Sequence, residues 1–370
     1  MKRVCIVEPV LTQYFFPVAL ELAERVRVDL IYSPRQKEYW SAFDDVAGQS
    51  SLQSSMLRLM CVPTFRPFGR RIGMYQSGVL RYLWTTRPNS VFISANARCL
   101  SFWLVIIVCR ILGLPVHAWG HGLYRRGRAS RPLRLVYAVM LRLLTSYICY
   151  TDKVLDSLVE NGLDGGKLSV GWNTLKNEHP VLPAEKNGME RGILFIGRLR
   201  ENSGIALLCR VVKRLRTEAG YDIKLHIVGD GPERHLIERE RALADVIFHG
   251  ATYDYHKIAQ ISRLCAVGCY AGNAGLSVVH YMSLSLVPVV HNRLASHQGP
   301  EPGYITNGTN GILFEQSPSL REASLYEALK SLFDHPGHIR KMQEMAFHTY
   351  QRLANPSLAT RFLRILLPGC

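Results

Sequence analysis

A glycine-rich turn is the first part of this sequence whose residue types could do chemistry. Gly272, Asn273 and Gly275 follow the apolar run 267–270, and Ser277 stands where the N-cap of a helix is expected. Glycines let backbone N–H groups approach an anion, and a helix N-terminus carries partial positive charge. The turn therefore favours a phosphate site, although an ordinary strand-to-helix turn that binds nothing would have the same sequence.

Arginine and glycine follow three other expected strands in the same half of the chain. Arg198, Gly229 and Gly250 each come within two residues of the end of a short apolar run. Because the carboxyl ends of parallel strands meet at one edge of a sheet, these residues should lie near the glycine turn. A guanidinium group is well suited to the oxygen atoms of a diphosphate. Together with the turn, Arg198 predicts a diphosphate site.

A histidine between two glycines ends an expected strand in the first half of the chain. His121 lies between Gly120 and Gly122, after the apolar run 116–119. The glycines leave the histidine sterically open, so it could hydrogen-bond a substrate or shuttle a proton. A histidine that only satisfies a nearby carbonyl group would fit the same pattern.

Residues 124–144 combine a cluster of arginines with an apolar helical pattern. The arginines of this cluster are Arg125, Arg126, Arg128, Arg131 and Arg134. Such a cluster beside an amphipathic helix can seat on anionic lipid headgroups or hold a diphosphate acceptor. A solvated basic loop before a core helix is the alternative interpretation.

Short apolar strands alternate with helical patterns, and this alternation must position the residues above. Residues 4–7 are typical of a strand buried on both faces in a parallel sheet, whereas residues 35–88 show no clear order. The polar segment 181–192 is the predicted linker, and the alternation restarts after it. We predict an α/β fold with two doubly wound, Rossmann-like domains facing each other across a cleft.

Composition limits the partners and the compartment. The chain has 45 Lys and Arg against 29 Asp and Glu, a net charge of +16 that favours anionic partners. The nine scattered cysteines include no Cys-x-x-Cys pair, which indicates a reducing compartment and no structural metal. The first residues read as a strand rather than a signal peptide. The longest apolar stretch, 100–108, is far shorter than the ~20 residues that span a bilayer.

Several well-defined site motifs are missing from the sequence. It has no Gly-x-Gly-x-x-Gly after the first strand, no P-loop and no Gly-x-Ser-x-Gly. These gaps argue against a dinucleotide oxidoreductase, a P-loop NTPase and a serine hydrolase of that type. Nucleic-acid binding would rest on net charge alone, since no reading motif with interleaved aromatic residues is present. We therefore predict neither nucleic acid as a partner nor a cofactor.

Taken together, these motifs resemble the GT-B glycosyltransferases of glycosyltransferase family 4, in a subgroup typical of bacterial polysaccharide biosynthesis. The strings that carry the resemblance are GRL, GDGP, FHG, GLSVVHYMS and NGTNGILF in the second half, and WGHGLYRR and YTDKVLDSLVENGL in the first. The resemblance implies an acceptor-binding domain at 1–182 and a nucleotide-sugar domain at 191–352. It also implies a C-terminal helix at 353–370 that packs back on the first domain.

The resemblance also implies roles for individual residues. His121 would face the donor sugar, Arg198 would contact the diphosphate, and His280 would take the place of the second of two family carboxylates. The residues implied in donor binding are Arg198, Gly229, Gly250, Asn273, Gly275, Leu276, Ser277 and Glu301. The chain departs from the family at Gly272, where the first carboxylate is missing, and at Ser203, where a lysine is common.

The implied function is a retaining hexosyl transfer from a nucleotide-diphosphate sugar to a glycan or lipid-linked acceptor in cell-surface polysaccharide or lipopolysaccharide biosynthesis. The implied location is the cytoplasm, at the inner face of the plasma membrane. The losses at Gly272 and Ser203 motivate an alternative, a non-catalytic partner or scaffold in a polysaccharide-assembly complex. Release of free nucleotide from nucleotide sugars separates the two hypotheses.

Overall fold

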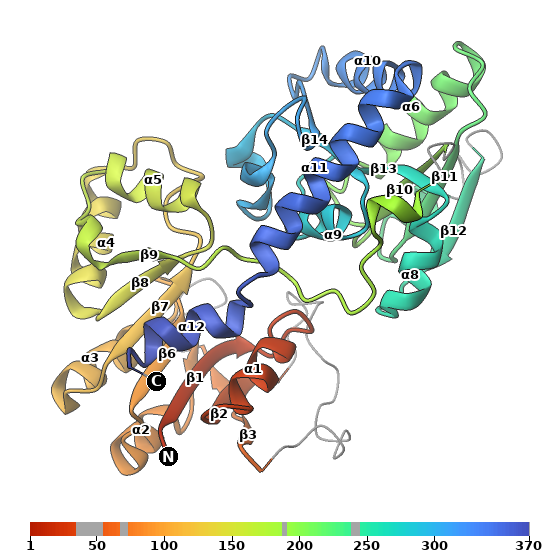
Figure 1. Ribbon diagram of the computed structural model, residues 1–370. Helices are drawn as coiled ribbons and strands as arrows, with labels where there is room; N and C mark the ends of the chain where they lie inside the picture. The colour runs from red at the N-terminus through yellow and green to blue at the C-terminus, as the bar shows by residue number, and fades with distance from the viewer. Residues whose placement is uncertain (35–54, 67–72, 187–190, 238–244, 370) are drawn as a thin grey trace. The chain divides into compact units, whose positions relative to one another are not determined.

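The computed structural model describes all residues except 35–54, 67–72, 187–190, 238–244 and 370 (Figure 1). The chain divides into two compact units. Unit 1 comprises Met1–Trp172 and Pro356–Cys370, and unit 2 comprises Asn173–Asn355. Each unit contains a parallel β-sheet covered by helices, so the predicted α/β class is confirmed.

The described part of unit 1 holds a seven-stranded parallel sheet in the order β3-β2-β1-β6-β7-β8-β9. Its strands are β1 (Arg3–Val10), β2 (Arg27–Ser33), β3 (Leu57–Cys61), β6 (Ser90–Ser94), β7 (Val116–Gly120), β8 (Ser146–Cys149) and β9 (Leu168–Val170). The helices are α1 (Phe16–Ala23), α2 (Val79–Thr86), α3 (Leu100–Leu112), α4 (Arg131–Leu143), α5 (Asp152–Glu160) and α12 (Leu358–Leu366). A two-stranded antiparallel hairpin pairs β4 (Thr64–Phe65) with β5 (Tyr75–Gln76).

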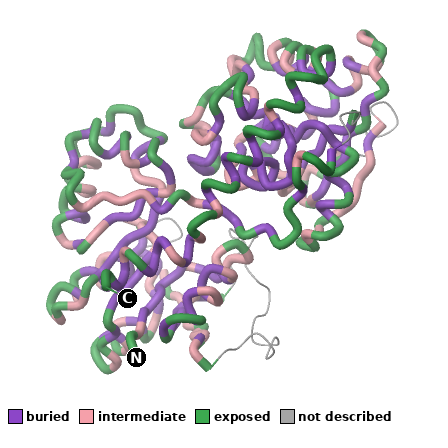
Figure 2. The backbone as a smooth tube through the Cα atoms, viewed as in Figure 1, coloured by how far each residue is buried: buried purple, intermediate pink, exposed green. Residues whose placement is uncertain are grey.

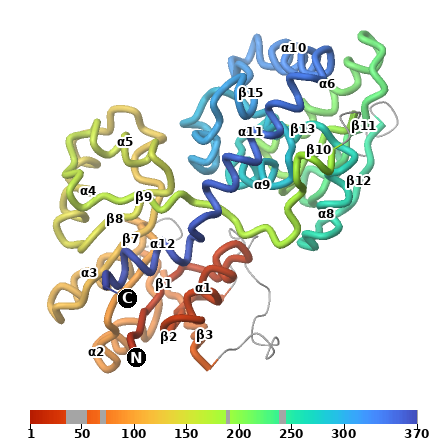
Figure 3. The backbone as a smooth tube through the Cα atoms, viewed as in Figure 1, coloured from red at the N-terminus to blue at the C-terminus, as the bar shows by residue number. Residues whose placement is uncertain are grey.

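The last helix of the chain packs in unit 1, against α1 and β6 (Figure 3). Its N-cap residue Ser357 accepts a hydrogen bond from the N–H of Thr360 at 3.1 Å. The ring of Phe362 lies 4.8 Å from that of Phe92 and 4.9 Å from that of Trp119. The C-terminal segment therefore completes the hydrophobic core of the sheet formed by the first half of the chain.

The described part of unit 2 holds a six-stranded parallel sheet in the order β12-β11-β10-β13-β14-β15. Its strands are β10 (Gly192–Ile196), β11 (Lys224–Val228), β12 (Val246–Gly250), β13 (Cys265–Tyr270), β14 (Val287–His291) and β15 (Ile312–Phe314). The helices are α6 (Ile205–Thr217), α8 (Tyr255–Ser262), α9 (Ser277–Ser283), α10 (Arg321–Asp334) and α11 (Pro336–Ala354), and short 3-10 turns include Glu301–Tyr304. The central strands are buried on both faces, as their apolar runs predict (Figure 2).

The predicted linker at 181–192 is wrong, because its described residues belong to unit 2. Val181 is fully buried in the core of unit 2, and its N–H donates to the carbonyl oxygen of Ser283 at 3.1 Å. The buried Lys186 donates from Nζ to the carbonyl oxygen of Cys265 at 2.9 Å. Residues 187–190 of this segment lie outside the described residues. The units divide at Trp172, before the boundary at residue 182 that the sequence predicted.

Candidate functional site

The carboxyl ends of β10, β11 and β12 are joined by direct backbone contacts that require glycine. The N–H of Gly229 donates to the carbonyl oxygen of Gly250 at 2.8 Å, and the N–H of Gly197 donates to that of Val228 at 3.0 Å. Gly229 has a φ of +148°, and a Cβ atom there would lie 1.8 Å from the carbonyl oxygen of Gly197. Packing between the strand ends therefore explains why residue 229 is a glycine. Gly250, with a φ of +73°, has nothing within 4 Å of its Cβ position, so space is open above it.

Replacement of Gly229 by alanine should destabilise unit 2 by about 3 kcal/mol, because the new methyl group meets backbone that cannot move independently of β10. Gly220→Ala is the matched control. Gly220 has a φ of +71° but open space around its Cβ position, so it should lose only about 1 kcal/mol from the left-handed backbone. Urea unfolding measures both variants, and equal losses would contradict this explanation of Gly229.

The turn that follows β13 packs against the loop that follows β10. The N–H of Asn273 donates to the carbonyl oxygen of Asn202 at 2.8 Å. A Cβ atom at Gly272 would lie 2.1 Å from that same oxygen and 2.7 Å from the nitrogen of Gly204. No larger side chain fits at Gly272 unless the loop moves. A backbone contact therefore takes the place of the carboxylate that the resemblance implies here.

Ser203, where the resemblance leads us to expect a lysine, lies in the same loop. Its side chain is fully buried, and Oγ donates to Oε2 of Glu233 at 2.8 Å. Oγ also accepts from the N–H of Ile205, at the start of α6, at 3.3 Å. The serine thus holds the loop that excludes a side chain at Gly272, so one loop accounts for both Ser203 and Gly272.

Two stacked histidines hold the other side of the turn. His291 and His297 are both fully buried, with ring centroids 3.7 Å apart. Nδ1 of His297 accepts from the N–H of Ala274 at 3.0 Å, and Nε2 lies 2.9 Å from the carbonyl oxygen of His291. Nδ1 of His291 accepts from the N–H of Arg293 at 3.2 Å, and its Nε2 lies 3.2 Å from Oδ1 of Asn273. This pattern fits two neutral rings with fixed tautomers, and it orients the Asn273 amide.

The helix α9 follows this turn, and it begins one position earlier than the sequence indicates. Leu276 is the N-cap residue and Ser277 is the first helical residue, so the predicted N-cap at Ser277 is wrong. His280 on α9 is 6% exposed, and burial lowers the pKa of its imidazole to about 4. Its Nε2 has no hydrogen-bond partner among the described residues, and its ring lies 5.5 Å from that of Tyr255. The histidine is therefore neutral at pH 7, and its Nε2 is a buried ring nitrogen that no described group satisfies.

Glu301 lies beside the glycine turn. The carboxylate is 2% exposed, and its Oε1 accepts from Nδ2 of Asn173 at 2.6 Å. A Cβ atom at Gly275 would lie 3.6 Å from Oε2 of Glu301, so the two are neighbours. The N–H groups of Gln298 and Gly299 donate to the carbonyl oxygen of Ala274 and fasten this segment to the turn. The structure thus brings together Glu301 and Gly275, two residues for which the resemblance implies donor binding.

Two arginines follow β10, whose neighbour in the sheet is β13. Arg198 is half-buried at the carboxyl end of β10, between the backbone contacts of Gly197 and Leu199. Arg200 donates a hydrogen bond from its guanidinium group to Oε1 of Gln298, whose N–H is bound to the turn. Arg200 is thus a second cation at the turn, and sequence spacing alone does not show this contact.

His121 and the arginine cluster lie in unit 1. Burial, with a smaller effect of the Arg125 cation, lowers the pKa of His121 to about 4, so this imidazole is also neutral at pH 7. Its ring centroid lies 4.3 Å from that of Tyr150. Nε of Arg125 donates to the hydroxyl of Tyr124 at 2.9 Å. The ring centroid of Tyr124 lies 6.1 Å from that of His121, so the histidine has an aromatic neighbour on two sides near the end of β7.

The arginine cluster borders an exposed apolar stripe on α4. The exposed cations are Arg125, Arg126, Arg128 and Arg131, whereas Arg134 is half-buried. Leu135 and Val139, one and two turns after Arg131 on the same helix, are 66% and 43% exposed. An apolar stripe next to several cations is typical of a surface that lies on anionic lipid.

A cavity of about 700 Å³ in unit 1 was not predicted from the sequence. Its walls include Phe65, Arg66, Tyr75, Leu100 and Leu104. No group of three or more His, Cys, Asp or Glu side chains that could hold a metal ion occurs among the described residues. Within the same residues, no helix combines the length and apolarity needed to cross a membrane.

Comparison with known proteins adds a family model that matches most of the second unit. Residues 190–335 match the model of "Glycosyl transferases group 1". The structure of HepE from Anabaena in complex with UDP is similar over 99% of this chain and 98% of that one, with a TM-score of 0.71 and 13% identity. The lipopolysaccharide outer core galactosyltransferase WaaB covers 100% of both chains at a TM-score of 0.68 and 12% identity.

A glycosyltransferase from Rickettsia africae covers 100% of this chain and 99% of its own, with a TM-score of 0.69 and 15% identity. No curated protein sequence matches the chain. At these identities the solved structures establish the fold, and the family model supplies the domain. The chain therefore has the two-domain GT-B fold and is a glycosyltransferase, with a group 1 glycosyl transferase domain at residues 190–335.

Proposed function

We propose that the chain moves a sugar from a nucleotide-diphosphate sugar to a glycan or lipid-linked sugar, with retention of anomeric configuration. The observation that carries the proposal is the cluster at the carboxyl edge of the unit 2 sheet. There the glycine turn, Arg200 and Glu301 are linked by hydrogen bonds or direct contact, and Arg198 follows the end of the neighbouring strand β10. HepE has been solved with UDP and with UDP-glucose, so UDP is the first nucleotide to test.

In this proposal the cations act on the leaving group. Arg198, together with the backbone N–H groups at the start of α9, would stabilise negative charge that develops on the departing diphosphate. Arg200 would add a second cation in place of the lysine missing at Ser203. Preorganised charges of this kind need no reorganisation during the reaction, so they usually supply the largest catalytic contribution.

Three further polar side chains would bind the uncharged parts of the donor. His280 offers Nε2 to a hydroxyl of the nucleotide or sugar, and Glu301 offers a carboxylate oxygen. His121 would contact the donor sugar, and its neutral ring can either donate or accept a hydrogen bond. No side chain is assigned as a nucleophile, which is compatible with a front-face displacement.

The test is release of free nucleotide from UDP-glucose, UDP-galactose, UDP-N-acetylglucosamine and GDP-mannose. The proposal predicts slow turnover of one donor in water and faster turnover with a suitable acceptor. Tight binding of a donor without any release would favour the alternative, a non-catalytic partner in a polysaccharide-assembly complex. Gly272 and Ser203 motivate that alternative, since both replace residues common in the family.

The acceptor site of this proposal lies at the inner face of the plasma membrane. Replacing Arg125, Arg126 and Arg128 by serine should weaken binding to vesicles containing phosphatidylglycerol about a hundredfold, since each cation near the surface contributes about 1 kcal/mol. Sedimentation with and without phosphatidylglycerol measures this. Arg210→Ser, a surface arginine of unit 2, is the control and should bind like the wild type. Equal binding by all three proteins would remove the cluster from the proposal.

A further inference from the structure

The carboxyl ends of β1 and β6 form the topological switch point of the unit 1 sheet. From β1 the chain adds β2 and β3 on one side and then returns to place β6 to β9 on the other side. The connections that follow β1 and β6 therefore leave in opposite directions. In open α/β sheets, ligands bind in the crevice that forms at this point.

Polar side chains are joined across three strand ends at this switch point. Oγ of Ser94, the last residue of β6, donates to Oε2 of Glu8 in β1 at 2.5 Å. Nε2 of Gln76 donates to the carbonyl oxygen of Glu8 at 2.8 Å and to Oγ of Ser33, the last residue of β2, at 3.1 Å. Gln76 is itself held by its N–H, which donates to Oγ of Ser101 at 2.6 Å. Gln76 thus fixes the backbone of Glu8, and Ser94 orients its carboxyl group.

Burial of the Glu8 side chain at this position lowers the stability of the fold. Its side chain is only 8% exposed, and Oε1 has no hydrogen-bond partner among the described residues. Burial raises the pKa of the carboxyl group to about 7, although the hydrogen bond from Ser94 acts in the opposite direction. Burying a carboxyl group without a full set of hydrogen bonds is unfavourable, and an apolar residue would pack here at lower cost. Groups of this kind are characteristic of functional sites.

The carboxyl group of Glu8 limits the kind of ligand that the site can bind. A carboxyl group hydrogen-bonds hydroxyl groups and disfavours phosphate, because the two carry the same charge. The diphosphate of a donor is therefore excluded, whereas an uncharged sugar is suited to the site. We propose that Glu8, positioned by Ser94, is a hydroxyl-binding subsite for the sugar acceptor. That this sugar is the acceptor rests on the proposed function, whereas the binding of an uncharged sugar by Glu8 does not.

The experiment replaces the pair and measures sugar binding. E8L/S94A removes both polar partners at once, so it should fold with a melting temperature equal to or above that of the wild type. The probes are the methyl glycosides of glucose, galactose and N-acetylglucosamine, titrated into the full chain and followed by NMR. We expect E8L/S94A to lose about tenfold or more in affinity for the glycoside that binds, because its hydroxyl would face an apolar side chain.

Two further variants make the test specific. E8Q keeps a hydrogen-bonding group and should retain glycoside affinity within a few-fold. S90A is the matched control, because Ser90 lies at the amino end of the same strand β6 and its buried Oγ also has no partner among the described residues. S90A should bind glycosides like the wild type. If E8L/S94A does not fold, Glu8→Ala takes its place, with the same expected loss.

Unchanged glycoside affinity in E8L/S94A would overturn the proposal, and so would a wild-type protein that binds none of the three probes. UDP affinity is measured on every variant and should not change. Binding of UDP without binding of any glycoside would contradict only the proposed subsite at Glu8. Glycoside binding that depends on Glu8, in a protein that binds no nucleotide, would contradict only the proposed function.

Discussion

Replacement of Arg198 by alanine should lower sugar transfer at least about a hundredfold. The guanidinium group is a fixed positive charge at the carboxyl end of β10, beside the strand whose end carries the glycine turn. Removal of one preorganised group that stabilises developing negative charge commonly costs 10² to 10³ in kcat, on the order of 3–4 kcal/mol. Initial rates of nucleotide release from the best donor, with and without acceptor, measure the effect. Arg198→Lys keeps the charge and should recover part of the activity.

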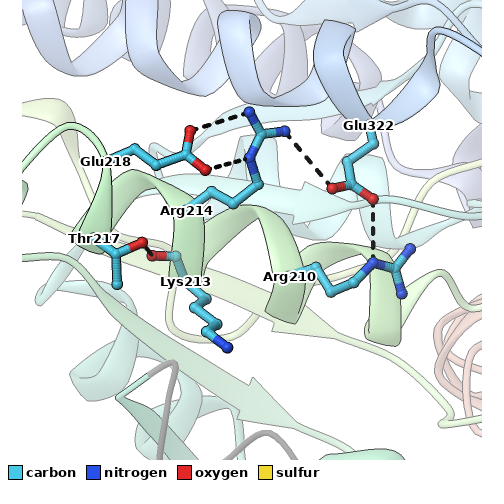
Figure 4. Close-up of polar contacts among 6 residues, drawn as sticks. All are labelled: Arg210, Lys213, Arg214, Thr217, Glu218 and Glu322. Carbon is cyan, nitrogen blue, oxygen red and sulfur yellow. Dashed lines mark hydrogen bonds and ion pairs between the residues drawn. The ribbon is translucent and has the colours of Figure 1, made fainter.

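The matched control is Arg210→Ala on α6 of the same unit. Figure 4 shows Arg210 in a surface network in which its Nε lies 3.1 Å from Oε2 of Glu322. Arg214 joins the same network through Glu322 and Glu218. Exposed ion pairs of this kind contribute at most about 1 kcal/mol to stability, and this one is not part of the predicted site. Arg210→Ala should transfer sugar normally. If Arg198→Ala did so too, the donor site would be wrongly assigned.

Unit 2 should lose much of its stability when the pH falls from 7 to 5. Burial lowers the pKa of His226 and His280 to about 4, and burial with the neighbouring His297 lowers that of His291 to about 3. In the unfolded chain a histidine has a pKa near 6.5. Between these values the unfolded state binds protons that the folded state does not, so stability is full above pH 6.5 and decreases as the pH falls toward 4.

At pH 5 the free energy of unfolding should be lower than at neutral pH by about 2 kcal/mol for each of the three histidines. Urea unfolding at pH 7.5 and at pH 5 measures it. His226→Gln removes one of these groups and should reduce the difference between the two pH values by about 2 kcal/mol, whatever its effect at pH 7.5. A free energy of unfolding that is the same at both pH values would show that these imidazoles are not kept neutral by the fold.

The sequence predicts the sheets well because parallel strands have a simple signature. Runs such as 193–196 and 267–270 are continuously apolar, since both faces of a central strand are buried. The division between the units was harder to predict. Residues 181–192 look like a linker because the segment as a whole is polar, yet Val181 and Lys186 are anchored by contacts with residues far along the chain. Composition cannot show such contacts.

The candidate site was predicted only in part, for the same reason. Gly275, Glu301 and the residues around Arg198 belong to strand ends and turns that a motif can show. The packing of Gly272 on the loop at 202–204 is a contact between two backbones, and no local pattern encodes it. The stacked pair His291 and His297 and the buried Glu8 likewise depend on neighbours from other elements. Unsatisfied or precisely held polar groups become visible only once the fold is known.

The central claim is that the carboxyl edge of the unit 2 sheet binds a nucleoside diphosphate. Calorimetric titration of UDP, and then of GDP and ADP, into the wild type and Arg198→Ala tests it most directly. We predict that one of these nucleotides binds the wild type at a single site, and that Arg198→Ala binds it about tenfold to a hundredfold more weakly, the loss expected for one charge-assisted contact. Equal affinity of the two proteins, or no binding of any of the three nucleotides, would contradict the claim.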